Sequence, residues 1–179
     1  MLNVIRDVFK DYKEPNNILD CKIKNINLFK KSHKLEIDLI SEKKITLLEI
    51  DKFEEFLKTK FQVSTVILNL EYDNKNEETE HKFSNVLESW EKIISYLAKK
   101  YPLTKAILHD STVKEDGNKL IVVLRTKNAD FMYSYELDKI IARLIYNLYG
   151  LKYKVEYEED VSEDIIKKQE KYFLESTCN

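Results

Sequence analysis

The chain has 179 residues, of which 43% are hydrophobic and 35% charged, and its formal net charge is −2. This balance is typical of a globular protein with a well-solvated surface, and it excludes a strong overall field that would attract nucleic acid or anionic lipid. No apolar stretch reaches the roughly 18 residues of a membrane span, and the N-terminus lacks a signal-peptide pattern. We therefore expect a cytoplasmic protein in which Cys21 and Cys178 are free thiols.

The first half of the chain predicts an α-β-β-α-β unit. Helices are expected where apolar residues recur every three or four positions, and strands where they alternate with polar ones. The predicted elements are a helix over 2–12, strands over 21–29 and 35–40, a helix over 47–61 and a strand over 65–72. Thr46, followed three residues later by Glu49, is a capping-box signature at the start of the second helix. Ile23, Ile26 and Leu28 are expected on one apolar face of the first strand.

The second half predicts the same order of elements. They are a helix capped by Ser84, strands at about 104–113 and 119–126, a long helical region that ends at Gly150, and a strand over 151–158. Asp116-Gly117 between two apolar runs is typical of a hairpin turn that requires a positive φ. Gly150 directly follows an apolar-periodic stretch, where it is expected to cap the helix in the left-handed conformation.

Both halves therefore predict an α+β fold made of two small modules, each a three-stranded sheet backed by helices. The predicted divisions are an N-terminal module over 1–72, a polar linker over 73–83, a second module over 84–160, and a C-terminal linker helix over 161–179. The last segment has no terminating signal, so we expect it to lead towards further domains of a longer protein.

The residue types and spacings favour no active site. The chain holds only two glycines, so it contains no P-loop, dinucleotide fingerprint or nucleophile elbow. His33, His81 and His109 lack the spacing of a helical metal site, and no cysteine pair supports them. We expect no catalytic, metal-binding or cofactor-binding residue, and no small-molecule ligand.

Basic side chains near the two predicted hairpins are candidate contacts to a partner or to nucleic acid. They are Lys30, Lys31 and Lys34 at the first hairpin and Lys119, Arg125 and Lys127 at the second. Contact with phosphate uses such groups. Acidic residues are interleaved with them throughout, so ordinary solvated surface is the alternative interpretation.

Five stretches carry a resemblance to a known family. The run Gly117–Val122, with Trp90 one helix earlier, is followed by the strand Tyr153–Tyr157 and the acidic exit Val161–Glu163. Together with the early Ile23–Leu39 hairpin and its lysine-rich turn, they resemble the N-terminal region of PolC-type DNA polymerase III alpha subunits. The resemblance extends collinearly over nearly the whole chain.

This resemblance implies a parent that is a DNA-directed DNA polymerase with 3′–5′ exonuclease activity, of which the present chain would be a non-catalytic N-terminal fragment. It also implies that the first module resembles the polymerase-binding domain of the clamp-loader tau subunit, and the second a type II KH domain. KH domains hold the nucleic-acid backbone with a GXXG loop. The corresponding stretch here, residues 128–136, contains no glycine, so the clamp is missing.

We therefore expect a protein-docking region within the replisome, with the clamp-loader tau subunit as a candidate partner and no membrane contact. The alternative is a KH-like accessory module that binds nucleic acid through its lysine-bearing hairpins. A small standalone enzyme is a third interpretation, which no motif supports.

Overall fold

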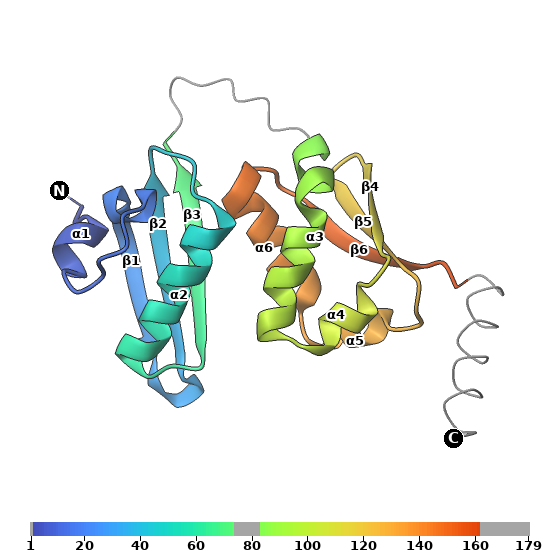
Figure 1. Ribbon diagram of the computed structural model, residues 1–179, viewed down its shortest axis with the longest axis horizontal. Helices are drawn as coiled ribbons and strands as arrows, with labels where there is room; N and C mark the ends of the chain where they lie inside the picture. Colours follow the sequence, from blue (N-terminus) through green and yellow to red (C-terminus); the bar gives the residue numbers. More distant parts are fainter. Residues whose placement is uncertain (1, 74–82, 162–179) are drawn as a thin grey trace. The chain divides into compact units, whose positions relative to one another are not determined.

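The computed structural model describes residues 2–73 and 83–161, arranged in two compact units (Figure 1). The first unit comprises Met1–Lys82 together with Arg143–Leu151, and the second comprises Phe83–Ala142 together with Lys152–Asn179. None of the helices in the described ranges is long and apolar enough to span a bilayer. The predicted helix over 162–175 lies outside the described residues.

The first unit holds a three-stranded sheet in the order β1-β2-β3. Its elements are α1 (Ile5–Val8), η1 (Asn17–Asp20), β1 (Lys22–Phe29), η2 (Lys30–Ser32), β2 (Lys34–Ser41), α2 (Leu47–Phe61) and β3 (Thr65–Tyr72). β1 and β2 form an antiparallel hairpin, and β2 is parallel to β3 because α2 crosses between them. Figure 1 shows α2 lying across one face of this sheet.

The core of the first unit forms where the alternating strands meet α2. Leu35, Ile37 and Leu39 of β2 are buried at every second position, as a half-covered strand requires. Phe9 and Phe53 meet edge to face, with ring centroids 5.7 Å apart. The buried apolar side chains of β3 and α2 are Val66, Leu68, Leu70, Ile50, Phe53 and Leu57. The apolar periodicity of the sequence therefore predicted the inward face of these elements.

Asn147 protects the backbone of β3 within the first unit. Its side-chain amide donates to the carbonyl of Leu68 at 2.7 Å, and its Oδ1 accepts from the N–H of Leu70 at 3.0 Å. The residue is only 3% exposed, so both bonds replace water that the strand edge would otherwise need. An edge strand covered in this way is withheld from pairing with another chain.

The second unit repeats the topology, with a sheet in the order β4-β5-β6. Its elements are α3 (Phe83–Lys100), α4 (Leu103–Ile107), β4 (Thr112–Asp116), β5 (Lys119–Leu124), α5 (Ala129–Ser134), α6 (Leu137–Tyr149) and β6 (Lys154–Glu159), with the end of α6 counted in the first unit. β4 and β5 are antiparallel, and β5 and β6 are parallel. The predicted α+β class, with two sheets backed by helices, is confirmed.

Several local predictions are confirmed by the structure. Thr46 Oγ1 accepts from the Glu49 N–H while the Glu49 carboxylate accepts from the Thr46 N–H, which completes the capping box. Gly117 has a φ of 58° at the second hairpin, and Gly150 has a φ of 67° directly after α6. These features depend on neighbouring residues alone, so sequence patterns predict them well.

Three predictions at helices were wrong. The first helix ends at Val8, because Phe9 leaves the helical region and Asn3–Val4 pairs with β1 instead. Ser84 lies inside α3 and does not cap it. The long helical region is broken between α5 and α6, where Glu136 takes a positive φ of 53°.

The predicted strand over 104–113 was also wrong over most of its length. Its first part forms the helix α4, and only Thr112 and Val113 belong to β4. Thr104, Ile107 and Leu108 are buried, and this spacing of three and four residues is that of a helix. Pro102 provides a helix-compatible φ at the N-cap.

Candidate functional site

The lysine-rich tip of the first hairpin carries two charges without an ionic partner among the described residues. Lys30 and Lys31 lie on η2 and are exposed. Lys34 differs, because its Nζ lies 3.4 Å from Glu36 Oε2 and 5.2 Å from the ring centroid of Phe29. The hairpin therefore offers two free ammonium groups beside an exposed aromatic ring.

Lysines on the strand leading to this tip are already paired. Lys22 Nζ lies 2.6 Å from Glu42 Oε1, and Lys24 Nζ lies 2.8 Å from Glu71 Oε2. The Lys22 ammonium holds the pKa of the Glu42 carboxyl below its usual range. Exposed pairs of this kind add little stability. They do place a carboxylate beside each lysine, with which a phosphate would have to compete.

The candidate basic residues of the second unit do not form one cluster. Lys119 begins β5 and Arg125 follows its end, so their backbones are separated by about 20 Å of strand. Lys119 Nζ lies 3.0 Å from Glu156 Oε2, and Arg125 forms an ion pair with Asp160. Lys127 is exposed and has no ion pair within the described ranges. Two of the three candidate cations are therefore neutralised by carboxylates, and Lys127 alone among them offers a free positive charge within the described ranges.

Glu156 lies between two cations on the second sheet. Lys154 and Lys119 both donate to its carboxylate and hold its pKa below the usual range. The pairing follows from the parallel register, which sets Ile121 opposite Glu156 and Lys119 opposite Lys154. This face of the sheet is a ladder of alternating charge rather than a basic surface.

A carboxylate lies at the start of α5, in the 128–136 segment that the family resemblance aligns with a KH clamp loop. Glu159 Oε1 accepts from the N–H of Ala129 at 2.9 Å, at the start of α5. Asp130, the next residue, adds a second negative charge. Together with the missing glycines, this arrangement disfavours backbone recognition of nucleic acid by the second unit.

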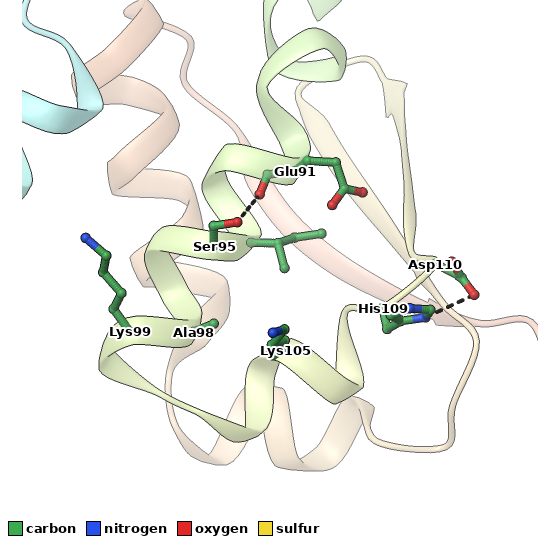
Figure 2. Close-up of a pocket in the computed structure, with 8 residues that line it drawn as sticks. Glu91, Ser95, Ala98, Lys99, Lys105, His109 and Asp110 are labelled. Carbon is green, nitrogen blue, oxygen red and sulfur yellow. Dashed lines mark hydrogen bonds and ion pairs between the residues drawn. The ribbon is translucent and has the colours of Figure 1, made fainter.

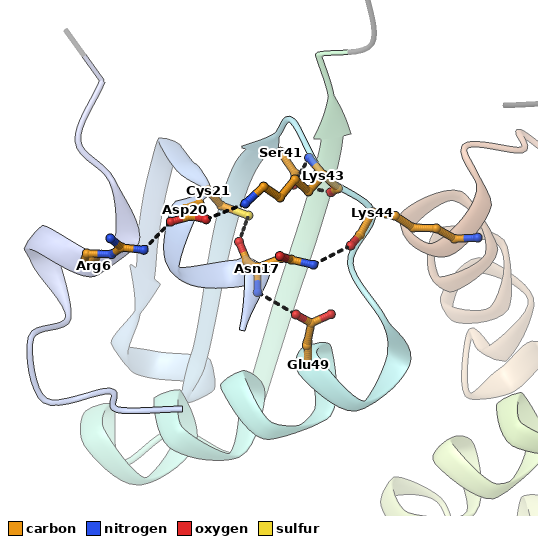
Figure 3. Close-up of polar contacts among 8 residues, drawn as sticks. All are labelled: Arg6, Asn17, Asp20, Cys21, Ser41, Lys43, Lys44 and Glu49. Carbon is orange, nitrogen blue, oxygen red and sulfur yellow. Dashed lines mark hydrogen bonds and ion pairs between the residues drawn. The ribbon is translucent and has the colours of Figure 1, made fainter. Parts of the chain in front are cut away.

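A polar network in the first unit joins η1 to the start of α2 (Figure 3). Asn17 donates its backbone N–H to Glu49 Oε1 at 2.7 Å, so the capping glutamate serves two elements at once. Asp20 is paired with both Arg6 and Lys43. These contacts give Asn17, Glu49 and Asp20 a structural role, which is to hold η1 against the start of α2.

Cys21 belongs to the same network and is not activated as a nucleophile. Its thiol is fully buried and donates to the carbonyl of Asn17 at 3.7 Å. Burial raises the pKa of the Cys21 thiol to about 11, so the thiolate is scarce near neutral pH. Cys21 is a free cysteine, as the sequence predicted.

A surface hollow of about 430 Å³ lies on the second unit beside α3 and α4 (Figure 2). Ser95 Oγ donates to the carbonyl of Glu91 at 2.9 Å, so its hydroxyl is engaged with its own helix and not with His109. His109 Nδ1 lies 3.0 Å from Asp110 Oδ2, and both side chains are largely exposed. The hollow shows no paired nucleophile and base, and the described residues contain no group of three or more acidic, histidine or cysteine side chains fit for a metal ion.

The edge of β1 is the feature that the sequence did not predict. Ile26, Leu28 and Phe29 are 39%, 42% and 44% exposed, although Ile26 and Leu28 were expected on the apolar face with Ile23. They do share that face, because Ile26 lies opposite Ile37 and Leu28 opposite Leu35. The sequence signals the face but not how far the covering helix extends towards the edge.

Comparisons with known proteins match two family models of the PolC-type N-terminal region to successive parts of the chain. The family described as DNA polymerase III polC-type N-terminus I matches residues 5–72, and that described as DNA polymerase III polC-type N-terminus II matches residues 88–175. A protein named DNA polymerase III PolC-type from Caldanaerobacter subterraneus subsp. tengcongensis is 27% identical over 168 residues. That alignment covers 84% of this chain and 12% of the relative, so the chain spans about an eighth of the relative's length.

Proposed function

Because this chain belongs to the N-terminal region of PolC-type DNA polymerase III, we propose that it is a non-catalytic docking region of a bacterial replicase. In this proposal it binds another replisome protein in the cytoplasm, and the clamp-loader tau subunit is the first candidate partner. DNA synthesis would belong to other parts of the parent polymerase.

The observation that carries this proposal is the open apolar edge of the first unit. Ile26, Leu28 and Phe29 expose apolar surface beside the unpaired charges of Lys30 and Lys31. Buried apolar surface bordered by polar groups is how protein interfaces are built. Two candidate nucleophiles, the Cys21 thiol and the Ser95 hydroxyl, instead donate hydrogen bonds to backbone carbonyls.

A direct binding measurement tests the docking role. Purified tau subunit is titrated into the 179-residue chain in a calorimeter, with the sliding clamp as a second candidate and an unrelated acidic protein as the control. We expect saturable one-to-one binding to one replisome protein and none to the control. Absence of binding to every replisome component would contradict the proposal.

Nucleic-acid binding is the second candidate, and Lys30 and Lys31 favour it because they lack ionic partners among the described residues. The carboxylates beside Lys119, Arg125 and the start of α5 count against it. Fluorescence anisotropy with labelled single-stranded and primed DNA at low salt separates the two candidates. Strong binding that falls steeply with added salt would favour the nucleic-acid role over docking.

A further inference from the structure

β1 is an edge strand whose outer side is only partly occupied. Val4 forms an antiparallel bridge with Lys22, and the N–H of Ile23 donates to the carbonyl of Asn3 at 2.7 Å. Figure 1 shows α1 beside this end of β1, and the hairpin tip at the other end of the strand. From Asn25 to Phe29, the pairing partner among the described residues is β2 alone. The outer edge of β1 thus already accepts a short extended segment at one end and leaves the rest open.

The open part of the edge carries apolar side chains on both faces of the sheet. Ile26 and Leu28 point to the face that α2 covers, while Phe29 lies opposite Lys34 on the other face. Natural edge strands are usually protected by charges, prolines or a covering element. Asn147 covers β3 in this way, whereas the apolar side chains of β1 remain exposed.

The charges at this edge select the occupant. β1 carries no acidic residue, and its Lys22 and Lys24 are paired with Glu42 and Glu71. Lys30 and Lys31, which have no ionic partner among the described residues, follow directly at the tip. A second copy of the chain paired edge to edge would set these lysines against their own counterparts, which is destabilising. An extended segment with acidic side chains is instead complementary in charge.

We propose that the edge of β1 from Asn25 to Phe29 binds an extended acidic peptide of a partner protein by strand addition. The peptide's backbone pairs with the open edge, its alternating apolar side chains cover Ile26 and Leu28, and its carboxylates meet Lys30 and Lys31. This inference deepens the docking role proposed above and rests on it for the identity of the partner protein.

The test uses a short fluorescein-labelled peptide in which two aspartates precede alternating valine and threonine. Its anisotropy is measured against the 179-residue chain. A second peptide with the same side chains carries N-methyl groups at alternate backbone nitrogens, which removes the donors that strand pairing needs. We expect the first peptide to bind and the methylated peptide to bind at least about tenfold more weakly. Equal binding of the two peptides would overturn strand addition.

Variants of the chain locate the site. Leu28→Lys is expected to weaken peptide binding about tenfold, because it replaces apolar contact with an edge charge. The pair Lys30→Glu and Lys31→Glu is expected to weaken it about fivefold at low salt. Leu48→Lys and the pair Lys10→Glu and Lys13→Glu are matched controls at exposed positions elsewhere in the first unit, and should leave binding unchanged. Equal losses in the controls would overturn the assignment to β1, and unchanged circular dichroism shows that each variant is folded.

Two further outcomes separate this inference from the docking role itself. If Leu28→Lys still binds the tau subunit as tightly as the unsubstituted 179-residue chain, the assignment of the site to the β1 edge is overturned and the docking role stands. If the unsubstituted chain binds the peptide but no replisome protein, the assignment of the peptide site to the β1 edge stands and the proposed docking role fails. If the unsubstituted chain dimerises and Leu28→Lys abolishes the dimer, the occupant of the edge is a second copy of the chain, and the peptide proposal is overturned.

Discussion

The two units have the same sheet topology but expose very different first strands. In each, the first strand lies at an edge, antiparallel to the central strand, and the third strand is parallel to it. β4 exposes Thr112, Lys114, Glu115 and Asp116 and buries only Val113. β1 exposes Ile26, Leu28 and Phe29. Charged edges resist pairing with another chain, so the same topology gives one protected edge and one open edge.

The two hairpins that join these strands differ in a related way. The second turn uses Gly117 at a φ of 58°, where a side chain would be strained. The first uses η2 and places His33 at a φ of 47°, a conformation that costs a non-glycine residue free energy. The first unit thus accepts local strain beside its open edge, while the second has the turn residue that its geometry favours.

The largest effect is expected at equivalent core positions of the two central strands. Leu35 and Leu120 are each fully buried, and each pairs with a valine of the parallel strand. Truncation to alanine should reduce the free energy of unfolding by about 2–5 kcal/mol at either site. Leu35→Ala should lie at the lower end, because the neighbouring Leu28 is on an open edge and can move inward.

Urea denaturation checks this prediction with one probe for the second unit and one for the whole chain. Trp90, the only tryptophan, is buried in the second unit and donates to Ser111 Oγ, so its fluorescence reports on that unit. Circular dichroism reports on the whole chain. A larger loss for Leu35→Ala than for Leu120→Ala would contradict the looser packing that we assign to the β1 edge.

The edge of β3, which Asn147 covers, should show the next largest loss of stability on mutation. Asn147→Ala leaves the Leu68 carbonyl and the Leu70 N–H without their buried partner, and is expected to cost about 2–3 kcal/mol. Asn25→Ala, on the open edge, is the matched control and should cost less than about 0.5 kcal/mol. Similar losses at both sites, measured by urea denaturation, would remove the distinction between the covered and the open edge.

The two turns should respond in opposite directions. Gly117→Ala is expected to cost about 1 kcal/mol from backbone strain alone, because an added Cβ meets no atom within 4 Å. His33→Gly is expected to stabilise the chain by about 0.5 kcal/mol, since it relieves a left-handed conformation but gains chain entropy on unfolding. Thermal unfolding measures both, and a change of the same sign in the two variants would refute the comparison.

The smallest effect is expected where ion pairs hold the basic residues of the second unit. Glu156→Gln frees Lys119 and Lys154 from a carboxylate, so binding of single-stranded DNA at low salt should rise by about twofold to fivefold. Glu55→Gln, at an exposed pair with Lys58 in the first unit, is the control. No gain over this control would show that the carboxylate does not mask the lysines.

Sequence patterns predicted the features of this fold that depend on close neighbours. Thr46 and Glu49 lie three residues apart, and the conformation of Gly117 is set by its own turn, so both the capping box and the turn could be predicted from the sequence. The helix α4 was missed because residues 104–108 hold branched side chains that also suit a strand, and only burial of Thr104 and Ile107 favours the helix.

The features of the candidate site were harder to predict from the sequence, for a physical reason. Lys119 meets Glu156 across a gap of 37 residues, and only the parallel register of β5 and β6 brings them together. Likewise, alternation placed Leu28 on the apolar face, but its exposure depends on where α2 lies over the sheet. Pairing and coverage are tertiary properties, so charge neutralisation and the open edge required the structure.

Backbone chemical shifts of the isotope-labelled chain, followed during titration with the acidic peptide, test the central contrast most directly. We predict that the perturbed amides cluster between Lys24 and Lys31, and that those of Thr112–Asp116 on the topologically equivalent strand do not move. Perturbations centred on β4, or spread equally over both edge strands, would contradict the assignment of docking to the open edge of the first unit.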